Sequence, residues 1–119
     1  KKILINGNGK QTRSFLYVDD CIDAFYKVFK KNIKNEVFNI GSDNEISVFQ
    51  LAKKIKKICK SNSKIYFNSK KFTKIGGFED IPRRVPCVDK LQKKTSWKPM
   101  INLDKGLEIM KKYMIINKH

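Results

Sequence analysis

Apolar residues recur every three or four positions in several stretches of the chain, and this period predicts helices. The first predicted helix begins at Asp19 or Asp20, because an acidic side chain is favourable at the positive end of a helix. Its apolar side chains are expected to face the core, with the lysines outside. They are Ile22, Phe25, Tyr26 and Phe29.

A second helix is predicted from Ser47, a good N-cap, to about residue 60. Its apolar stripe is expected to pack in a core, although a basic amphipathic helix can also lie on a membrane. A short helix is predicted over residues 88–95, and a last one begins at Asn102 or Asp104. One face of the last helix carries Leu107, Met110, Tyr113 and Met114.

Runs of β-branched and aromatic residues predict short strands over residues 12–18, 37–40 and 64–68. Gly7, Asn8 and Gly9 give a turn signal before the first of them, and no convincing strand precedes this turn. Short strands that alternate with about four helices favour an α/β fold. A length of 119 residues allows one domain at most.

The net charge of +16 raises the question of nucleic-acid binding. Nearly all of the positive charge is lysine, which is spread along the whole chain, and only Arg13, Arg83 and Arg84 are arginines. Solvated lysine faces are therefore the preferred interpretation, with no nucleic-acid partner. The alternative is a small basic module that binds nucleic acid or another polyanion.

Cys21, Cys59 and Cys87 are odd in number and far apart, and His119 is the only histidine. This pattern indicates free, mostly buried thiols and supports neither a zinc site nor a disulfide framework. The chain shows no apolar run as long as a signal-peptide core or a membrane span. We therefore expect a soluble, cytoplasmic protein without a membrane partner.

Three segments, in this order, resemble the extended short-chain dehydrogenase family of sugar-nucleotide epimerases, dehydratases and decarboxylases. Residues 7–20 (GNGKQTRSFLYVDD) are similar to its G-x-G-x-Q-x-R-x-[FY]-x-[YH]-V-x-D segment. Residues 38–47 (FNIGSDNEIS) are similar to its [FY]-N-[IL]-G loop, and residues 80–99 (DIPRRVPCVDKLQKKTSWKP) to its R-x-P-D…G-W-x-P ending. The chain departs from the family at Cys87, in place of Asp, and at Ser96, in place of Gly.

The resemblance implies that residues 1–119 are the C-terminal, substrate-binding portion of an extended Rossmann-type enzyme. The family's Gly-rich dinucleotide fingerprint is missing, since Thr12 stands where a third glycine would follow Gly7 and Gly9. NAD would then be bound by an N-terminal half that this chain lacks. The pairs Tyr26…Lys30 and Tyr66…Lys70 are accidental matches to the catalytic Tyr-x-x-x-Lys, so no catalytic residue is assigned.

The substrate-binding candidates follow from the resemblance and from the chemistry of arginine, whose planar fork suits a diphosphate. Arg13 is assigned to the diphosphate, with an ion pair to Asp19 or Asp20 as the alternative. Asp80 would accept from ribose hydroxyls or only cap a turn. One of Arg83 and Arg84 would face phosphate. Weaker candidates are Gln11 and Asn44, and Trp97 is expected to pack the last helices together.

If the resemblance holds, the intact enzyme would oxidise C4 of a UDP- or dTDP-hexose with NAD, and would form a homodimer. The 4-keto intermediate would then lead to epimerisation, dehydration or decarboxylation, and the isolated chain would show no turnover. Besides the basic binding module, a stand-alone sugar-nucleotide sensor remains a third interpretation.

Overall fold

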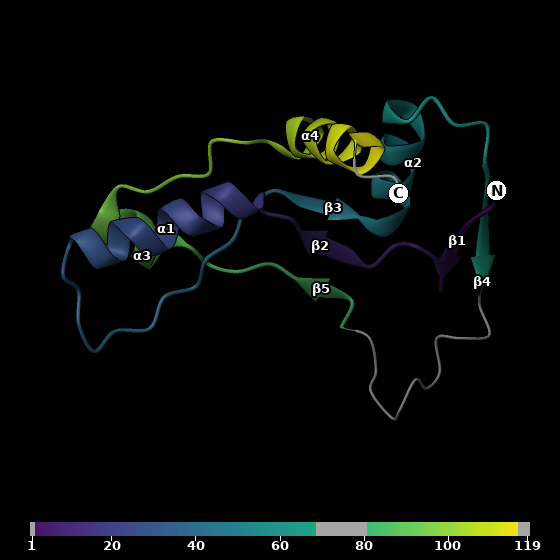
Figure 1. The fold of residues 1–119 in the computed structure, drawn as a ribbon. Coiled ribbons are helices and arrows are strands. Elements are labelled where there is room, and N and C mark those ends of the chain that lie inside the picture. Colours follow the sequence, from purple (N-terminus) through teal and green to yellow (C-terminus); the bar gives the residue numbers. More distant parts are fainter. Residues whose placement is uncertain (1, 69–80, 117–119) are drawn as a thin grey trace. The chain divides into compact units, whose positions relative to one another are not determined.

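The computed structural model describes residues 2–68 and 81–116 of the chain (Figure 1). The chain divides into two compact units, which are described separately below. Unit 1 consists of Lys1–Arg13 and Ile46–Arg84, and unit 2 consists of Ser14–Glu45 and Val85–His119. Helices and short strands alternate along the described part, so the predicted α/β class is confirmed.

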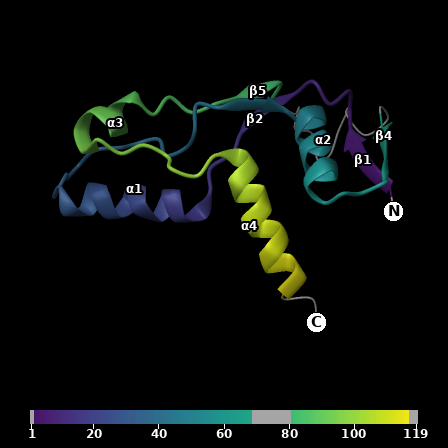
Figure 2. The ribbon, with the colours of Figure 1, turned by 90° about the horizontal axis from the view of Figure 1, so that it is seen from above.

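Unit 1 contains a pair of parallel strands with a helix packed against it. Strand β1 (Lys2–Asn6) pairs with β4 (Lys64–Asn68) in the register Lys2↔Lys64 to Asn6↔Asn68, and α2 (Val48–Ile58) contacts β1 (Figure 2). Strand β4 was predicted, whereas β1 was missed. The few apolar residues of β1 form a strand because β4 supplies the hydrogen-bonding partners and Ile5 is buried.

A second sheet has the strand order β3-β2-β5, formed by β2 (Thr12–Ser14), β3 (Glu45–Ser47) and β5 (Arg83–Arg84). The predicted strand over residues 12–18 is therefore wrong in its length. The strand ends at Ser14, and α1 already begins at Val18. Periodicity alone did not separate these two elements, because β-branched and aromatic residues continue across the boundary.

The glycine turn between β1 and β2 is confirmed. Gly7 has φ 78° and Gly9 has φ 70°, a region that glycine enters at no steric cost. A Cβ atom on Gly9 would also lie 3.1 Å from the side chains of Phe49 and Phe67. The Phe49 amide donates to the Gly9 carbonyl at 3.0 Å, so the turn is held against the start of α2.

Ser47 caps α2 as predicted. Its hydroxyl accepts from the Gln50 amide at 3.1 Å, and the Gln50 side chain accepts from the Ser47 amide at 3.1 Å. This reciprocal pair is a capping box, which satisfies amides that the first turn leaves without a partner. The helix ends at Ile58, two residues before the predicted end.

Unit 2 begins with α1 (Val18–Lys30), and its N-terminus differs from the prediction. Tyr17 occupies the N-cap position without a side-chain cap, so neither Asp19 nor Asp20 serves as the cap. Asp20 is instead buried, and its carboxylate accepts from the amides of Met100 at 3.0 Å and Ile101 at 2.9 Å. This carboxylate therefore ties α1 to the segment that precedes the last helix.

The core of unit 2 is built around Trp97, which is fully buried beside Ala24 and Leu91. The Trp97 indole N–H donates to the Asp20 carbonyl at 3.1 Å. Trp97 is thus a core residue, but it packs α3 (Asp89–Thr95) against α1 and does not pack the last two helices together as predicted. Helix α3 supplies Leu91, and its C-cap is Ser96, whose φ of 57° is left-handed. This conformation explains why glycine suits that position in the resembling family.

Residues 37–40 do not form the predicted strand. Phe38 and Ile40 pack against the core of unit 2, while the Asn39 amide group donates to the Cys87 carbonyl at 3.2 Å. A Cβ atom on Gly41 would lie only 2.3 Å from Cγ of Pro86, so glycine is required for this approach. The segment is held by side-chain packing and this close approach, without a strand ladder.

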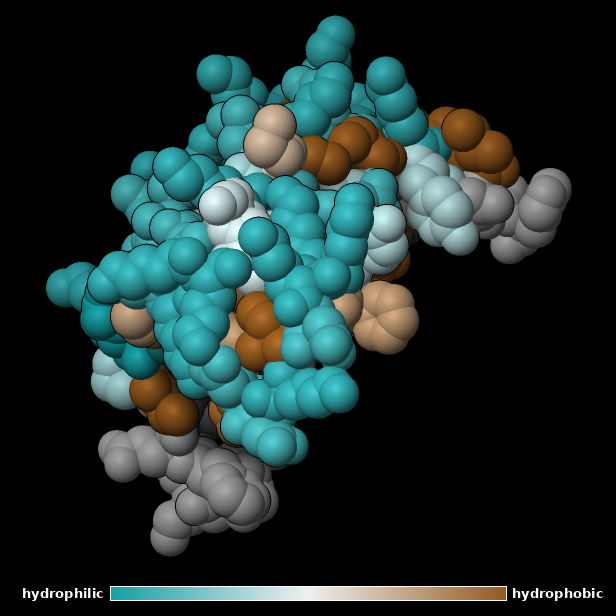
Figure 3. Space-filling model, turned by 90° about the vertical axis from the view of Figure 1, so that its left-hand side faces the viewer, coloured by the Kyte–Doolittle hydropathy of each residue, from teal (hydrophilic) through white to brown (hydrophobic). Residues whose placement is uncertain are grey.

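The apolar stripe predicted to face the core from α1 is exposed in this chain, so that prediction is wrong. Phe29 is 83% exposed, and Ile22, Phe25 and Tyr26 are also exposed, whereas the buried residues of α1 are Asp20 and Ala24. The last helix, α4 (Leu103–Ile116), has no buried residue, and in Figure 2 it extends away from α1 and α3. Hydrophobic residues reach the surface in several places among hydrophilic ones (Figure 3).

The three cysteines are free thiols, as predicted, but their expected burial is wrong for two of them. Cys21 is half-buried, whereas Cys59 and Cys87 are exposed. Within residues 2–68 and 81–116, no helix has the length and apolar character that crossing a bilayer requires.

Candidate substrate-binding site

The three arginines of the chain lie on two neighbouring strands of unit 1. Strands β2 and β5 run parallel, with Thr12 opposite Arg83 and Arg13 opposite Arg84. The Thr12 amide donates to the Pro82 carbonyl at 2.8 Å, which continues the ladder toward residue 81. Residues 71 positions apart in the sequence are thereby brought to one place.

The register separates the roles of the two adjacent arginines. Side chains of residues opposite each other on neighbouring strands project from the same face, and successive residues project from opposite faces. Arg13 and Arg84 are therefore expected on one face of the sheet, and Arg83 on the other. Since neighbouring strands lie about 4.8 Å apart, a pair of guanidinium groups on one face suits the two phosphates of a diphosphate.

Arg13 is held by backbone carbonyls within unit 1. Its side chain is half-buried, and Nη1 donates to the carbonyls of Ile81 at 2.8 Å and of Thr12 at 2.6 Å. These hydrogen bonds restrict the rotamers of a long side chain, so that less conformational entropy is lost when a ligand binds. Arg84 is exposed at the matching position of β5.

Gln11 lies directly before β2 in the same unit. Its side-chain Nε2 donates to the Asn6 carbonyl at 3.1 Å, and the Gln11 carbonyl accepts from the Val48 amide at 3.0 Å. Its side-chain Oε1 is the one buried polar side-chain atom without a partner that the described residues contain. Gln11 therefore links the end of β1, the glycine turn and the start of α2, and it retains one unused acceptor.

The structure places neither of the two remaining candidates relative to the arginines. Asn44 is exposed in unit 2, where its amide donates to the Ser42 hydroxyl at 3.1 Å in a turn. Asp80 lies outside the described residues, so its predicted contact with ribose stays a prediction. Sequence reasoning also missed the carbonyls of Ile81 and Pro82, because backbone acceptors leave no residue-type signal.

The Tyr-x-x-x-Lys matches that were judged accidental belong to α1 and to the region of β4, and not to the strands that carry the arginines. In α1 the Lys30 ammonium group lies over the Tyr26 ring, 5.9 Å from its centroid. In β4 the Tyr66 ring contacts Lys2 in the same manner at 5.3 Å, and Lys70 is outside the described residues. Residues 2–68 and 81–116 contain no cluster of three His, Cys, Asp or Glu side chains suited to hold a metal ion.

Solved structures of sugar-nucleotide enzymes share this fold. UDP-glucose 4-epimerase from Thermotoga maritima, solved with UDP-glucose, matches with a TM-score of 0.83 at 25% identity, over 100% of this chain and 36% of that one. UDP-glucuronic acid 4-epimerase from Bacillus cereus, in complex with UDP-glucuronic acid and NAD, matches with a TM-score of 0.81 at 29% identity, over 98% and 36%. The fold is that of part of a Rossmann-type epimerase or dehydratase chain.

The family is shown by sequence as well. The family model described as GDP-mannose 4,6 dehydratase matches residues 1–110, and the chain belongs to this family of extended short-chain dehydrogenases that act on sugar nucleotides. UDP-N-acetyl-alpha-D-glucosaminuronate decarboxylase from Bacillus cytotoxicus is 36% identical over 89% of this chain and 33% of its own length. Human dTDP-D-glucose 4,6-dehydratase is 44% identical over 53% of this chain and 18% of its own length. The chain thus spans a third or less of these relatives.

Proposed function

We propose that this chain is the nucleotide-sugar-binding part of an NAD-dependent 4-epimerase, 4,6-dehydratase or decarboxylase that acts on a UDP- or dTDP-hexose. The observation that carries the proposal is the register of β2 and β5, which places Arg13 and Arg84 opposite each other. Two guanidinium groups at this spacing offer paired donors to a diphosphate, and relatives of the chain act on sugars linked to such a group.

The residues of the chain bind and orient the substrate in this proposal. Arg13, fixed by the Ile81 carbonyl, holds one phosphate, and Arg84 holds the other. The binding energy gained at the nucleotide then holds the sugar in place for reaction elsewhere in the enzyme.

A bound NAD would provide the group that accepts hydride from the sugar. No residue of this chain is assigned to NAD, because the three-glycine fingerprint is missing from the Gly7 turn. The structure of the Bacillus cereus epimerase contains NAD as well as UDP-glucuronic acid. We therefore expect the cofactor and the catalytic tyrosine to lie in a preceding half, and the 119-residue chain alone to show no turnover.

The exposed apolar side chains of unit 2 support such a missing half. Ile22, Phe25 and Phe29 on α1 are exposed, as are Met110 and Met114 on α4. Exposed apolar surface of this kind is costly in water and marks a surface that another part of a protein covers. The rest of the enzyme, or a second subunit of the proposed homodimer, would cover it.

The test compares two arginines that are adjacent in sequence. Binding of UDP-glucose and dTDP-glucose is measured by calorimetry for the full-length enzyme and for its variants Arg84→Ala, Arg83→Ala and Arg13→Ala. Loss of charged hydrogen bonds should weaken binding roughly tenfold or more for Arg84→Ala and for Arg13→Ala. Arg83→Ala, on the other face, serves as the matched control and should bind nearly as the wild type.

Lysine replacements separate charge from geometry. Arg84→Lys keeps the charge but loses the bidentate fork, so it should restore only part of the affinity. Equal binding by Arg83→Ala and Arg84→Ala would contradict the face assignment. Unchanged binding by Arg13→Ala would contradict the proposed diphosphate site itself.

A further inference from the structure

The net charge of the chain is concentrated in unit 1, although lysines occur along the whole sequence. Unit 1 contains fifteen of the 27 Lys and Arg residues but only two acidic residues, Glu79 and Asp80. Unit 2 contains the other twelve basic residues together with nine acidic ones. The net charge is thus +13 for unit 1 and +3 for unit 2.

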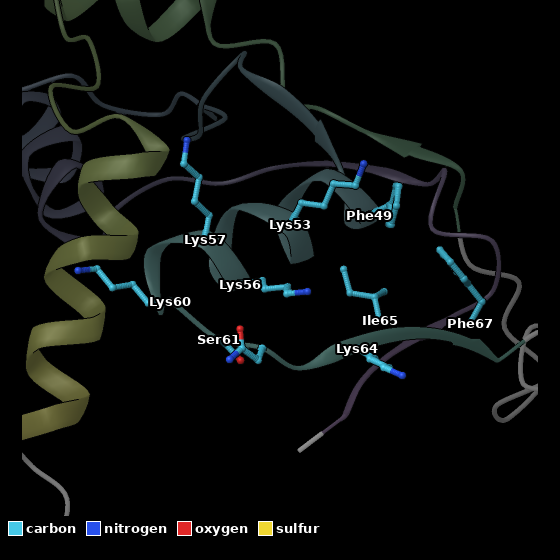
Figure 4. A pocket seen from close by; sticks show the side chains of 10 residues that line it. Phe49, Lys53, Lys56, Lys57, Lys60, Ser61, Lys64, Ile65 and Phe67 are labelled. Carbon is cyan, nitrogen blue, oxygen red and sulfur yellow. The ribbon is translucent and has the colours of Figure 1, made fainter.

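Within unit 1 the lysines gather around an open groove of about 900 Å³ between α2 and β4 (Figure 4). Its basic lining comes from both elements and from the turn that joins them. These side chains are Lys53, Lys56, Lys57, Lys60 and Lys64. None of them belongs to the arginine site, and the only acidic residues of unit 1 are Glu79 and Asp80.

The groove has an apolar and aromatic floor. Phe49, Ile65 and Phe67 line it together with the lysines, and Figure 4 shows Ile65 and Phe67 on the strand that faces α2. The rings of Phe49 and Phe67 lie 5.4 Å apart at a tilt of 51°, and Phe67 remains 50% exposed. The Lys53 ammonium group lies 4.3 Å from the centre of the Phe49 ring.

We propose that this groove binds single-stranded nucleic acid. Several lysines around one groove repel one another, and a chain of phosphates relieves this repulsion while releasing counterions. A half-exposed aromatic ring between the charges offers a surface on which a base can stack. Lysines act as mobile point charges without the arginine fork, so the binding is independent of base sequence.

The arrangement of charge and apolar surface favours this partner over other polyanions. An acidic peptide has no bases to stack on Phe67. An anionic membrane would require apolar side chains that protrude beyond the lysines, whereas here Phe49, Ile65 and Phe67 line the groove together with the lysines. A nucleic-acid duplex keeps its bases stacked inside and presents mainly phosphates. A nucleic-acid partner was not expected from the sequence, where the lysines are scattered. The structure instead gathers several of them around one groove.

The test measures the binding of a fluorescein-labelled 20-nucleotide oligouridylate to the full-length protein by fluorescence anisotropy at several salt concentrations. The double variant Lys56→Gln, Lys60→Gln should bind about tenfold more weakly at 0.1 M salt, with a slope against log salt reduced by about 1.4. The control variant Lys93→Gln, Lys98→Gln removes two exposed lysines of unit 2 and should bind as the wild type.

A second variant tests the aromatic floor. Phe67→Leu keeps an apolar side chain but removes the ring, so it should weaken oligouridylate binding about fivefold and leave the binding of polyglutamate unchanged. Circular dichroism checks that each variant is folded, and the lysine pair tests the groove independently of this ring. Saturating UDP-glucose should not displace the oligonucleotide, because the two sites share no residue.

Three outcomes would overturn the proposal. The first is an equal loss of oligonucleotide affinity in the groove variant and in the control lysine variant. The second is displacement of the oligonucleotide by UDP-glucose. The third is an affinity for polyglutamate as high as that for the oligonucleotide, together with no effect of Phe67→Leu. Each differs from a failure of the proposed function, in which UDP- or dTDP-hexose would not bind at all.

Discussion

The two units of this chain are stabilised in different ways. Unit 2 is stabilised by the buried side chain of Trp97, by the buried carboxylate of Asp20 and by the close approach of Gly41 to Pro86. Unit 1 is held by parallel strand ladders, a glycine turn and a capped helix, and it carries most of the positive charge. The residues that stabilise the chain therefore differ largely from those proposed to bind ligands, so single substitutions should affect one property without the other.

The largest effect is expected at Asp20 in unit 2. Asp20→Ala removes the acceptor of two amides, those of Met100 and Ile101, and should lower the free energy of unfolding by about 3 kcal/mol. The change is measured by urea denaturation, with exposed Asp19→Ala as the matched control, which should stay within about 0.5 kcal/mol of wild type. An equal loss of unfolding free energy in both variants would show that the buried carboxylate of Asp20 does not stabilise unit 2.

A smaller loss is expected at Gly41, where the chain passes closest to Pro86. Gly41→Ala places a methyl group 2.3 Å from Cγ of Pro86 and should cost about 2 kcal/mol. The double variant Gly41→Ala, Pro86→Ala should recover part of this loss, because the clash is relieved. Strictly additive effects in the thermodynamic cycle would show that the contact with Pro86 is not the cause.

In unit 1 the corresponding stability test is the helix cap. Ser47→Ala removes the capping box and should cost about 1 kcal/mol, whereas Ser47→Asp keeps an acceptor and should be close to wild type. Neither variant should change the affinity for UDP-glucose by more than about twofold, since the arginines lie on other strands. A large loss of affinity in Ser47→Ala would show that the residues that stabilise unit 1 also determine ligand binding.

The smallest expected effect is a decrease of stability at acid pH that arises from Glu36 in unit 2. Lys94 and then Lys90 hydrogen-bond to Glu36 and lower its carboxyl pKa below the ordinary value of 4.5. A lowered folded-state pKa contributes stability that is present above the ordinary pKa and is lost as the pH falls through the lower folded value. Because the side chains of Lys94 and Lys90 are about half exposed, solvent screens their interaction with Glu36, and the loss of stability as the pH falls below 4.5 should be small.

The measurement is the urea midpoint as a function of pH for wild type and Glu36→Gln. The variant should lack this part of the acid dependence and match wild type at the lowest pH. An identical slope in both proteins would place the acid sensitivity on other carboxylates.

Local signals in the sequence determined the parts of the structure that depend on neighbouring residues. Ser47 and Gln50 form their capping box within one helical turn, and Gly7 and Gly9 enter positive φ because the turn between two strands requires it. The motifs also indicated the family and the three arginines before any geometry was known. Such features are visible in sequence because their interactions span only a few positions.

Only the tertiary structure decided the features that depend on distant partners. Strand β1 forms because β4 pairs with it, residues 37–40 lack such a neighbour, and Asp20 bonds to amides eighty positions away instead of capping its own helix. The pairing of Arg13 with Arg84, and the gathering of lysines in one groove, likewise follow from strand register and helix packing. The sequence pattern of a helix or strand indicates its hydrophobic period. Which other element it packs or pairs with depends on the free energy of packing the whole chain.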